Sequence, residues 1–102
     1  MLNKDQILNI ITNHRLQIKK LGVDKIGLFG SYSRNEQTEN SDIDILVSFR
    51  PSEETFDNLM DLSFLLQSLF PQHRLDIATT NGLSPYIGPK ILQEVTYAKV
   101  AA

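Results

Sequence analysis

The chain has 102 residues, 41% of them hydrophobic and 22% charged, and its formal net charge is −2. This length predicts a single domain, residues 1–102, with one core. The mildly acidic balance argues against stable nucleic-acid binding. The absence of cysteine excludes disulfides, thiolate chemistry and cysteine-based zinc sites. No stretch approaches the roughly 20 apolar residues of a membrane span and no signal peptide is indicated, so we expect a cytoplasmic protein without a membrane partner.

The first two predicted elements are a helix over residues 3–21 and a strand over residues 23–30. Apolar residues recur along one helical face, and Asn3 is placed to begin the helix with a capping box. His14 lies at the border of that face, where a structural role is more common than metal binding. Within the strand, Gly27 predicts the close approach of another backbone.

A Gly30–Ser31 turn follows this strand and opens a short helix or turn predicted over residues 31–36. The backbone N–H groups at the start of such a helix have no partner within it. Together with the helix dipole they favour an anion at that point. The turn is therefore a candidate phosphate-binding site.

Residues 41–49 predict a second strand, with the cleanest apolar alternation in the chain. Asp42 and Asp44 fall on one face of it, because side chains alternate along a strand. Their Cα atoms are expected about 7 Å apart, from the rise of a strand per residue. Two carboxylates this close raise each other's pKa unless a cation lies between them, and Mg²⁺ suits such oxygen ligands. If the first two strands are antiparallel neighbours, Ser31 lies beside these acids.

Three more elements complete the pattern, namely a helix over residues 55–70, a strand over 74–79 and a helix over 84–98. Phe56 begins the apolar stripe of the first of these helices. A helix between the second and third strands predicts that these strands run parallel. We therefore expect an α/β (α+β) fold of order α-β-α-β-α-β-α, with a small mixed sheet of three or slightly more strands.

Asp76 is the one acid in the otherwise apolar third strand, where a charge is costly unless it is paired or bound to metal. If this strand lies beside the second, Asp76 joins Asp42 and Asp44 at one end of the sheet. Asp42 alone has a simpler interpretation as a turn residue, and Asp44 alone as an exposed acid of a strand. Together with the Gly-Ser turn they form a coherent site for a metal-bound nucleoside triphosphate, in which Asp76 is placed to help deprotonate an incoming hydroxyl.

The spacing of Gly30-Ser31, Asp42-Ile43-Asp44 and the later Asp76 resembles the signature of the DNA polymerase β-like nucleotidyltransferase superfamily. Within it, the stretches Leu28-Phe29-Gly30-Ser31-x-x-Arg34 and Ser41 to Val47, in so short a chain, are similar to the minimal nucleotidyltransferases. These include the antitoxins of HEPN/MNT toxin–antitoxin pairs. The resemblance spans most of the chain.

The resemblance implies Mg²⁺-dependent transfer of AMP from ATP, with two ions and release of pyrophosphate. In the antitoxin branch the acceptor is a tyrosine hydroxyl of a HEPN-type toxin, in a type VII-like pair. The implied site residues are Gly30, Ser31 and Arg34 for the nucleotide, and Asp42, Asp44 and Asp76 as catalytic metal ligands. Taken alone, Arg34 is more simply a surface arginine, so its role depends on the resemblance.

Two positions depart from the family pattern, since Tyr32 stands where many relatives have Arg and Asn35 where many have Gly. The first removes a positive contact near the phosphates, and the second could alter the turn after the short helix. Two other functions stay open, an antitoxin that neutralises its partner by binding alone and an aminoglycoside-type nucleotidyltransferase. Enzymes of the latter kind carry an extra helical domain. Nothing in this chain forms an acceptor-binding domain, so we expect a partner to supply the acceptor.

Overall fold

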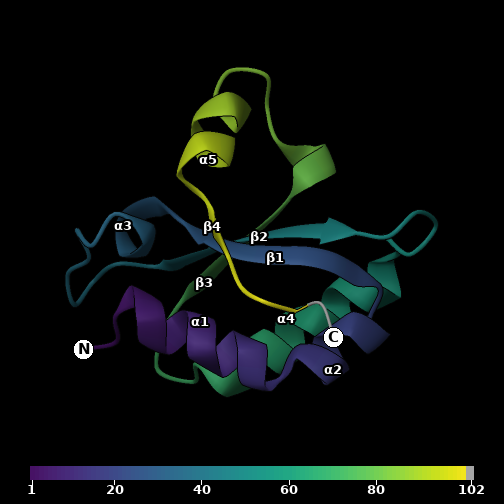
Figure 1. Ribbon diagram of the computed structural model, residues 1–102, viewed down its shortest axis with the longest axis horizontal. Helices are drawn as coiled ribbons and strands as arrows, with labels where there is room; N and C mark the ends of the chain where they lie inside the picture. Colours follow the sequence, from purple (N-terminus) through teal and green to yellow (C-terminus); the bar gives the residue numbers. More distant parts are fainter. Residues whose placement is uncertain (101–102) are drawn as a thin grey trace.

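The computed structural model describes residues 1–100 as a mixed sheet with helices on both faces (Figure 1). In chain order the elements are α1 (Lys4–Asn13), α2 (Arg15–Lys20), β1 (Val23–Phe29), α3 (Gly30–Ser33), β2 (Ile43–Phe49), α4 (Phe56–Leu69), β3 (Leu75–Thr79), the 3-10 turn η1 (Thr80–Gly82), α5 (Gly88–Glu94) and β4 (Thr96–Tyr97).

The sheet has four strands in the order β3-β2-β1-β4. β1 pairs antiparallel with both β2 and β4, whereas β2 and β3 run parallel. The predicted α/β class is confirmed, as are the antiparallel first pair and the parallel second pair. This topology puts the start of β2 beside the end of β1, where α3 begins.

The two faces of the sheet bury different side chains. In Figure 1, α1, α2 and α4 lie together on one side of the sheet and α5 lies on the other. The larger core, on the side of the three helices, takes Ile45 and Val47 from β2. A smaller cluster of Phe29, Leu46 and Ile91 packs between the sheet and α5. Burial of each such side chain contributes about 1.5–3 kcal/mol, so β2 is anchored from both faces.

The predicted helix over residues 3–21 is two helices that meet at His14. The capping box at Asn3 is confirmed, with the Gln6 N–H donating to the Asn3 side chain. His14 leaves helical geometry at φ −109° and ψ 19°, and its Nδ1 lies 2.8 Å from the Ile10 carbonyl oxygen. The Asn-His pair at this point has low helix propensity, which favours a break. His14 therefore has a structural contact.

The predicted final helix over residues 84–98 is wrong. Only the seven residues of α5 are helical, and the chain becomes extended at Val95 before β4 pairs with β1. Proline and glycine delay the start of α5, and the β-branched pair Val95-Thr96 favours a strand. Gly27 leaves room for β4, since a Cβ at Gly27 would lie 2.9 Å from the Thr96 carbonyl oxygen. The close backbone approach predicted at Gly27 is thus confirmed.

α4 begins one residue later than predicted, with Thr55 as its N-cap. Leu62 and Leu66 are fully buried, whereas Phe56, expected to be buried, is 77% exposed because the buried stripe starts further along the helix. α4 is the longest helix at 14 residues, and no helix within residues 1–100 is long and apolar enough to span a membrane.

Candidate active site

The turn between β1 and α3 is built around Gly30. Its φ is +74°, a left-handed value that glycine adopts without the steric cost other residues meet. A Cβ at this position would overlap the carboxylate of Asp44 on the neighbouring strand. The sheet register explains this contact, because Phe29 pairs with Asp44. The Gly-Ser turn and the acid-bearing strand therefore meet, as the antiparallel arrangement predicts.

Asp44 and Asp76 lie opposite each other on adjacent strands. The parallel register of β2 and β3 pairs these two residues, and the negative charge of Asp76 raises the pKa of the Asp44 carboxyl. Asp76 is exposed because β3 is an edge strand of the sheet. Its charge is therefore less costly than it would be on an interior strand of the sheet. The predicted juxtaposition of the two acids at one end of the sheet is present.

The environment of Asp44 raises the pKa of its carboxyl to about 6. Burial is the largest cause, followed by the negative charges of Asp76 and Asp42, while Arg34 acts in the opposite direction. The expected rise in the pKa of at least one acid is thus confirmed. An acid in this state marks a concentration of negative charge that a bound cation would relieve.

Asp42 lies just before β2, which begins at Ile43 instead of at residue 41. Its Oδ1 accepts a hydrogen bond from Arg74 Nε at 3.1 Å, and the two side chains are 40% and 84% exposed. Ion pairs as open as this contribute little free energy and exchange readily. A cavity of about 330 Å³ opens beside the pair. In this arrangement the guanidinium of Arg74 balances the negative charge of Asp42.

Within residues 1–100, no three His, Cys, Asp or Glu side chains come together in a group that could hold a metal ion. The structure joins Asp44 with Asp76, and the third predicted ligand, Asp42, is paired with Arg74 instead. Carboxylate oxygens are the donors that Mg²⁺ prefers. The donor chemistry and the raised pKa of Asp44 fit a divalent cation, with two of the three predicted ligands already adjacent.

Arg34 is held between two carboxylates. Its Nε lies 2.9 Å from Glu36 Oε1 and its Nη1 lies 2.8 Å from Glu94 Oε2. The other carboxylate oxygen of Glu94 accepts the Gly30 backbone N–H at 3.2 Å. Sequence reasoning missed Glu94, because a residue 60 positions from Arg34, in the helix expected over residues 84–98, carries no pattern that singles it out. The positive charge of Arg34 is thus shared with two protein carboxylates.

The two departures from the family pattern have different structural outcomes. Tyr32 is 1% exposed and belongs to the main core, and burial raises the pKa of its hydroxyl. Its side chain therefore packs away from the solvent instead of offering a contact to phosphate. Asn35 has φ +57°, a left-handed conformation that asparagine tolerates better than most residues. The turn after α3 thus has the backbone shape that glycine would give it.

Comparison with known families and proteins extends these observations. The profile of the nucleotidyltransferase domain matches residues 11–98. The chain is 38% identical over 100 residues to the protein adenylyltransferase MntA of Thermococcus cleftensis, a match that covers 95% of this chain and 97% of that protein.

Solved structures give matches of the same kind. A protein assigned as a minimal nucleotidyltransferase superposes with a TM-score of 0.70 at 29% identity, covering 87% of this chain and 93% of that chain. A complex of a tri-AMPylated Shewanella oneidensis HEPN toxin with its MNT antitoxin matches with a TM-score of 0.60 at 19% identity, covering 89% of this chain and 71% of that chain. The second likeness concerns the fold alone.

Proposed function

Because the chain belongs to the nucleotidyltransferase domain family and joins Asp44 to Asp76 beside the Gly30 turn, we propose that it transfers AMP from ATP to a tyrosine hydroxyl of a HEPN toxin. It is a nucleotidyltransferase, and its relative from Thermococcus cleftensis is named a protein adenylyltransferase. The Asp44–Asp76 pair is the observation that carries the proposal. We further propose that residues 1–102 act as one domain. This domain would be the antitoxin of a type VII-like toxin–antitoxin pair in the cytoplasm.

The Gly30–Ser31 turn is assigned to the triphosphate. Gly30 gives the turn its left-handed shape, and the half-buried Ser31 offers its hydroxyl at the start of α3. The positive charge of Arg34 opposes the rise in the pKa of Asp44, and Arg34 is assigned as a contact to the phosphates. ATP is the substrate that the adenylyltransferase relative suggests.

Asp44 and Asp76 are assigned as ligands of Mg²⁺, together with Asp42 once it exchanges Arg74 for the cation. Two ions are the expected number. When bound, they supply positive charge for the attacking and leaving oxygens of the phosphoryl displacement. The raised pKa of Asp44 supports this assignment, since a cation favours the ionised carboxylate.

The proposed reaction is a displacement at the α-phosphorus of ATP. The tyrosine oxygen forms a bond to this phosphorus, and the bond from the phosphorus to pyrophosphate breaks. The hydroxyl proton passes to Asp76, which is exposed on the edge strand and accessible to an incoming partner. The products are an AMP ester of tyrosine and pyrophosphate.

The test is transfer of label from α-labelled ATP, with Mg²⁺, to the HEPN partner. Asp44→Asn is expected to reduce transfer by at least about 100-fold, since losing even a group that only hydrogen-bonds a metal ligand costs about 10–100-fold. Asp24→Asn, a matched control on an exposed acid of β1, is expected to leave transfer unchanged. Equal transfer by wild type and Asp44→Asn would refute the proposed mechanism.

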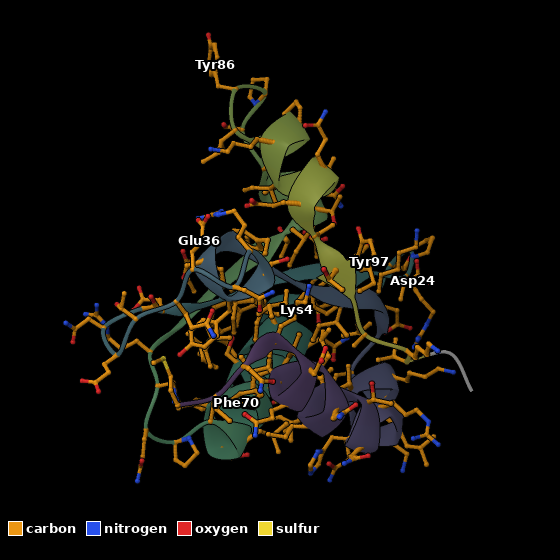
Figure 2. All side chains as sticks on the ribbon, turned by 60° about the vertical axis from the view of Figure 1, so that its left-hand side comes forward. Lys4, Asp24, Glu36, Phe70, Tyr86 and Tyr97 are labelled. Carbon is orange, nitrogen blue, oxygen red and sulfur yellow. The ribbon has the colours of Figure 1, made fainter. Side chains whose placement is uncertain are left out.

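Neutralisation by binding alone is the second candidate, and an exposed apolar arm favours it. Between β3 and β4 the chain projects from the body, with Tyr86 at its tip (Figure 2). Tyr86, Ile87 and Leu92 are 95%, 54% and 48% exposed. Such a surface suits contact with a partner protein. If the triple variant with Asn at 42, 44 and 76 still silences the toxin's ribonuclease activity, binding suffices and catalysis is not the means of neutralisation.

A further inference from the structure

We propose that Glu94 is a positioning residue that holds both ends of α3 and thereby sets the shape of the nucleotide-binding turn. This inference rests on the proposed function, because it assigns the turn to the triphosphate. Glu94 is the last residue of α5, in the segment that connects the projecting arm to β4. It reaches α3 across 60 to 64 positions of the sequence.

Three separate contacts join Glu94 to α3. Its Oε1 accepts the Gly30 N–H at 3.2 Å, at the first residue of the helix. Its Oε2 lies 2.8 Å from Nη1 of Arg34, the C-cap of the helix. Its backbone carbonyl accepts the Ser33 hydroxyl at 2.8 Å. One residue therefore fixes the start, the last turn and the cap of α3.

α3 needs such support because it has only four residues. A single helical turn is not stable alone, since nucleation costs more free energy than its few hydrogen bonds return. The Asp44 carboxylate packs against Gly30, and the Glu94 carboxylate accepts the Gly30 N–H. Two carboxylates from different elements therefore hold Gly30, the residue before Ser31.

The Glu94 carboxylate is held in its charged form. Burial alone would raise its pKa, but the hydrogen bonds from Arg34 and from the Gly30 backbone, with the charges of Arg34 and Lys90, lower it overall. Its side chain is 18% exposed, compared with 64% for Glu36, the other partner of Arg34. Arg34 therefore serves to neutralise Glu94 beside a site meant for an anion.

A competing interpretation is that Glu94 occupies the place of a phosphate at the Gly30 N–H. The hydrogen bond from the Ser33 hydroxyl to the Glu94 backbone carbonyl argues against this interpretation. A phosphate that displaced the Glu94 carboxylate would not replace this bond, so Glu94 is joined to α3 by more than its carboxylate. The two interpretations predict opposite effects of removing the carboxylate. Loss of a positioning group weakens nucleotide binding, whereas loss of a competitor strengthens it.

The experiment measures the affinity of the full chain for Mg²⁺ with AMP-PNP by calorimetry, and kcat and KM for ATP with the HEPN partner. Glu94→Ala is expected to weaken binding and raise KM by roughly tenfold, the scale of one charge-assisted hydrogen bond. kcat should change less, because Asp44 and Asp76 are untouched. Glu94→Gln keeps an acceptor for the Gly30 N–H and is expected to fall between Glu94→Ala and wild type.

Glu36→Ala is the matched control, since it removes one carboxylate from Arg34 but no contact to Gly30 or Ser33. It is expected to bind as wild type does. The amide resonance of Gly30 should shift in both Glu94 variants and stay in place in Glu36→Ala. If Glu94→Ala fails to fold, the nearly isosteric Glu94→Gln and the Gly30 resonance decide the question.

Unchanged or tighter nucleotide binding in folded Glu94 variants would overturn the positioning role, and tighter binding would identify a competitor. If the wild-type chain binds no Mg²⁺ with AMP-PNP, the proposed function is refuted, and this inference is refuted with it. If the wild-type chain binds Mg²⁺ with AMP-PNP and the Glu94 variants bind it equally well, only the inference is refuted. The two failures are thus distinguishable.

Discussion

The carboxylate of Asp44 occupies the space that a side-chain carbon at Gly30 would need. This contact ties the end of β1 to the first acid of β2, because the two residues lie across neighbouring positions of the antiparallel pair. Gly30 also has a left-handed φ of +74°. The turn that we assign to phosphate and the strand that we assign to metal are therefore in direct contact.

Gly30→Ala is expected to damage stability and activity together. The left-handed backbone alone costs an alanine about 1–2 kcal/mol, and the new methyl group must displace Asp44. Urea denaturation should reveal a loss of at least that size, and label transfer should fall with it. Gly82→Ala is the comparison, since Gly82 has no left-handed φ and its Cβ would require only a shift of the Thr79 side-chain oxygen, 2.9 Å away. A fully stable and active Gly30→Ala would contradict the described turn.

The raised pKa of Asp44, about 6, predicts a pH dependence of stability in the absence of metal. Between about pH 4, the ordinary value for aspartate, and pH 6, the native state retains a proton that the unfolded chain has released. The free energy of unfolding therefore falls as the pH rises through this window and stays lowered above it. After allowance for solvent screening the fall is on the order of 1–2 kcal/mol.

Asp44→Asn should lack this fall, because it carries no carboxyl at this position. Urea denaturation at about pH 4 and about pH 8, with chelator present, makes the comparison. Asp24→Asn, altered on an exposed acid of β1, should keep the wild-type dependence. Parallel curves for wild type and Asp44→Asn would refute the assignment of the raised pKa to Asp44.

Magnesium with nucleotide is expected to stabilise the chain. Ligand at 100 times its Kd adds about 2.7 kcal/mol, which corresponds to roughly 11–22 °C in the Tm of a domain of this size, at about 4–8 °C for each kcal/mol. A thermal scan with Mg²⁺ and AMP-PNP should record this rise, and chelation should reverse it. Asp44→Asn and Asp76→Asn should respond weakly. A Tm unmoved in wild type would argue against a working metal site.

Local patterns in the sequence were sufficient to predict the centre of the fold. The alternation through Ile43, Ile45 and Val47 located β2, and the apolar strand around Asp76 located its parallel neighbour. β4 was missed because a two-residue strand has no measurable period. Gly27 indicated that a backbone would approach but not which one.

The unpredicted parts of the site are contacts between distant segments. Glu94 meets Gly30 across 64 positions, and its role depends on where α5 ends, which no local pattern sets. The Asp42–Arg74 pair is similar, since strand alternation predicts that Asp42 shares a face with Asp44 but not that an exposed arginine holds it. The proposed metal and nucleotide ligands could be named from the sequence, whereas the side chains that they contact in this structure, Arg74 and Glu94, could not.

The Asp42–Arg74 pair predicts that arginine competes with the cation for Asp42. Arg74→Gln should free Asp42 and raise Mg²⁺ affinity in the presence of AMP-PNP by roughly twofold to fivefold, the value of an exposed ion pair. Stability should change little, since Arg74 is 84% exposed. Calorimetric titration with Mg²⁺ measures the effect, and Lys99→Gln controls for the loss of one positive charge. Weaker Mg²⁺ binding in Arg74→Gln would instead mean that Arg74 holds Asp42 ready for the metal.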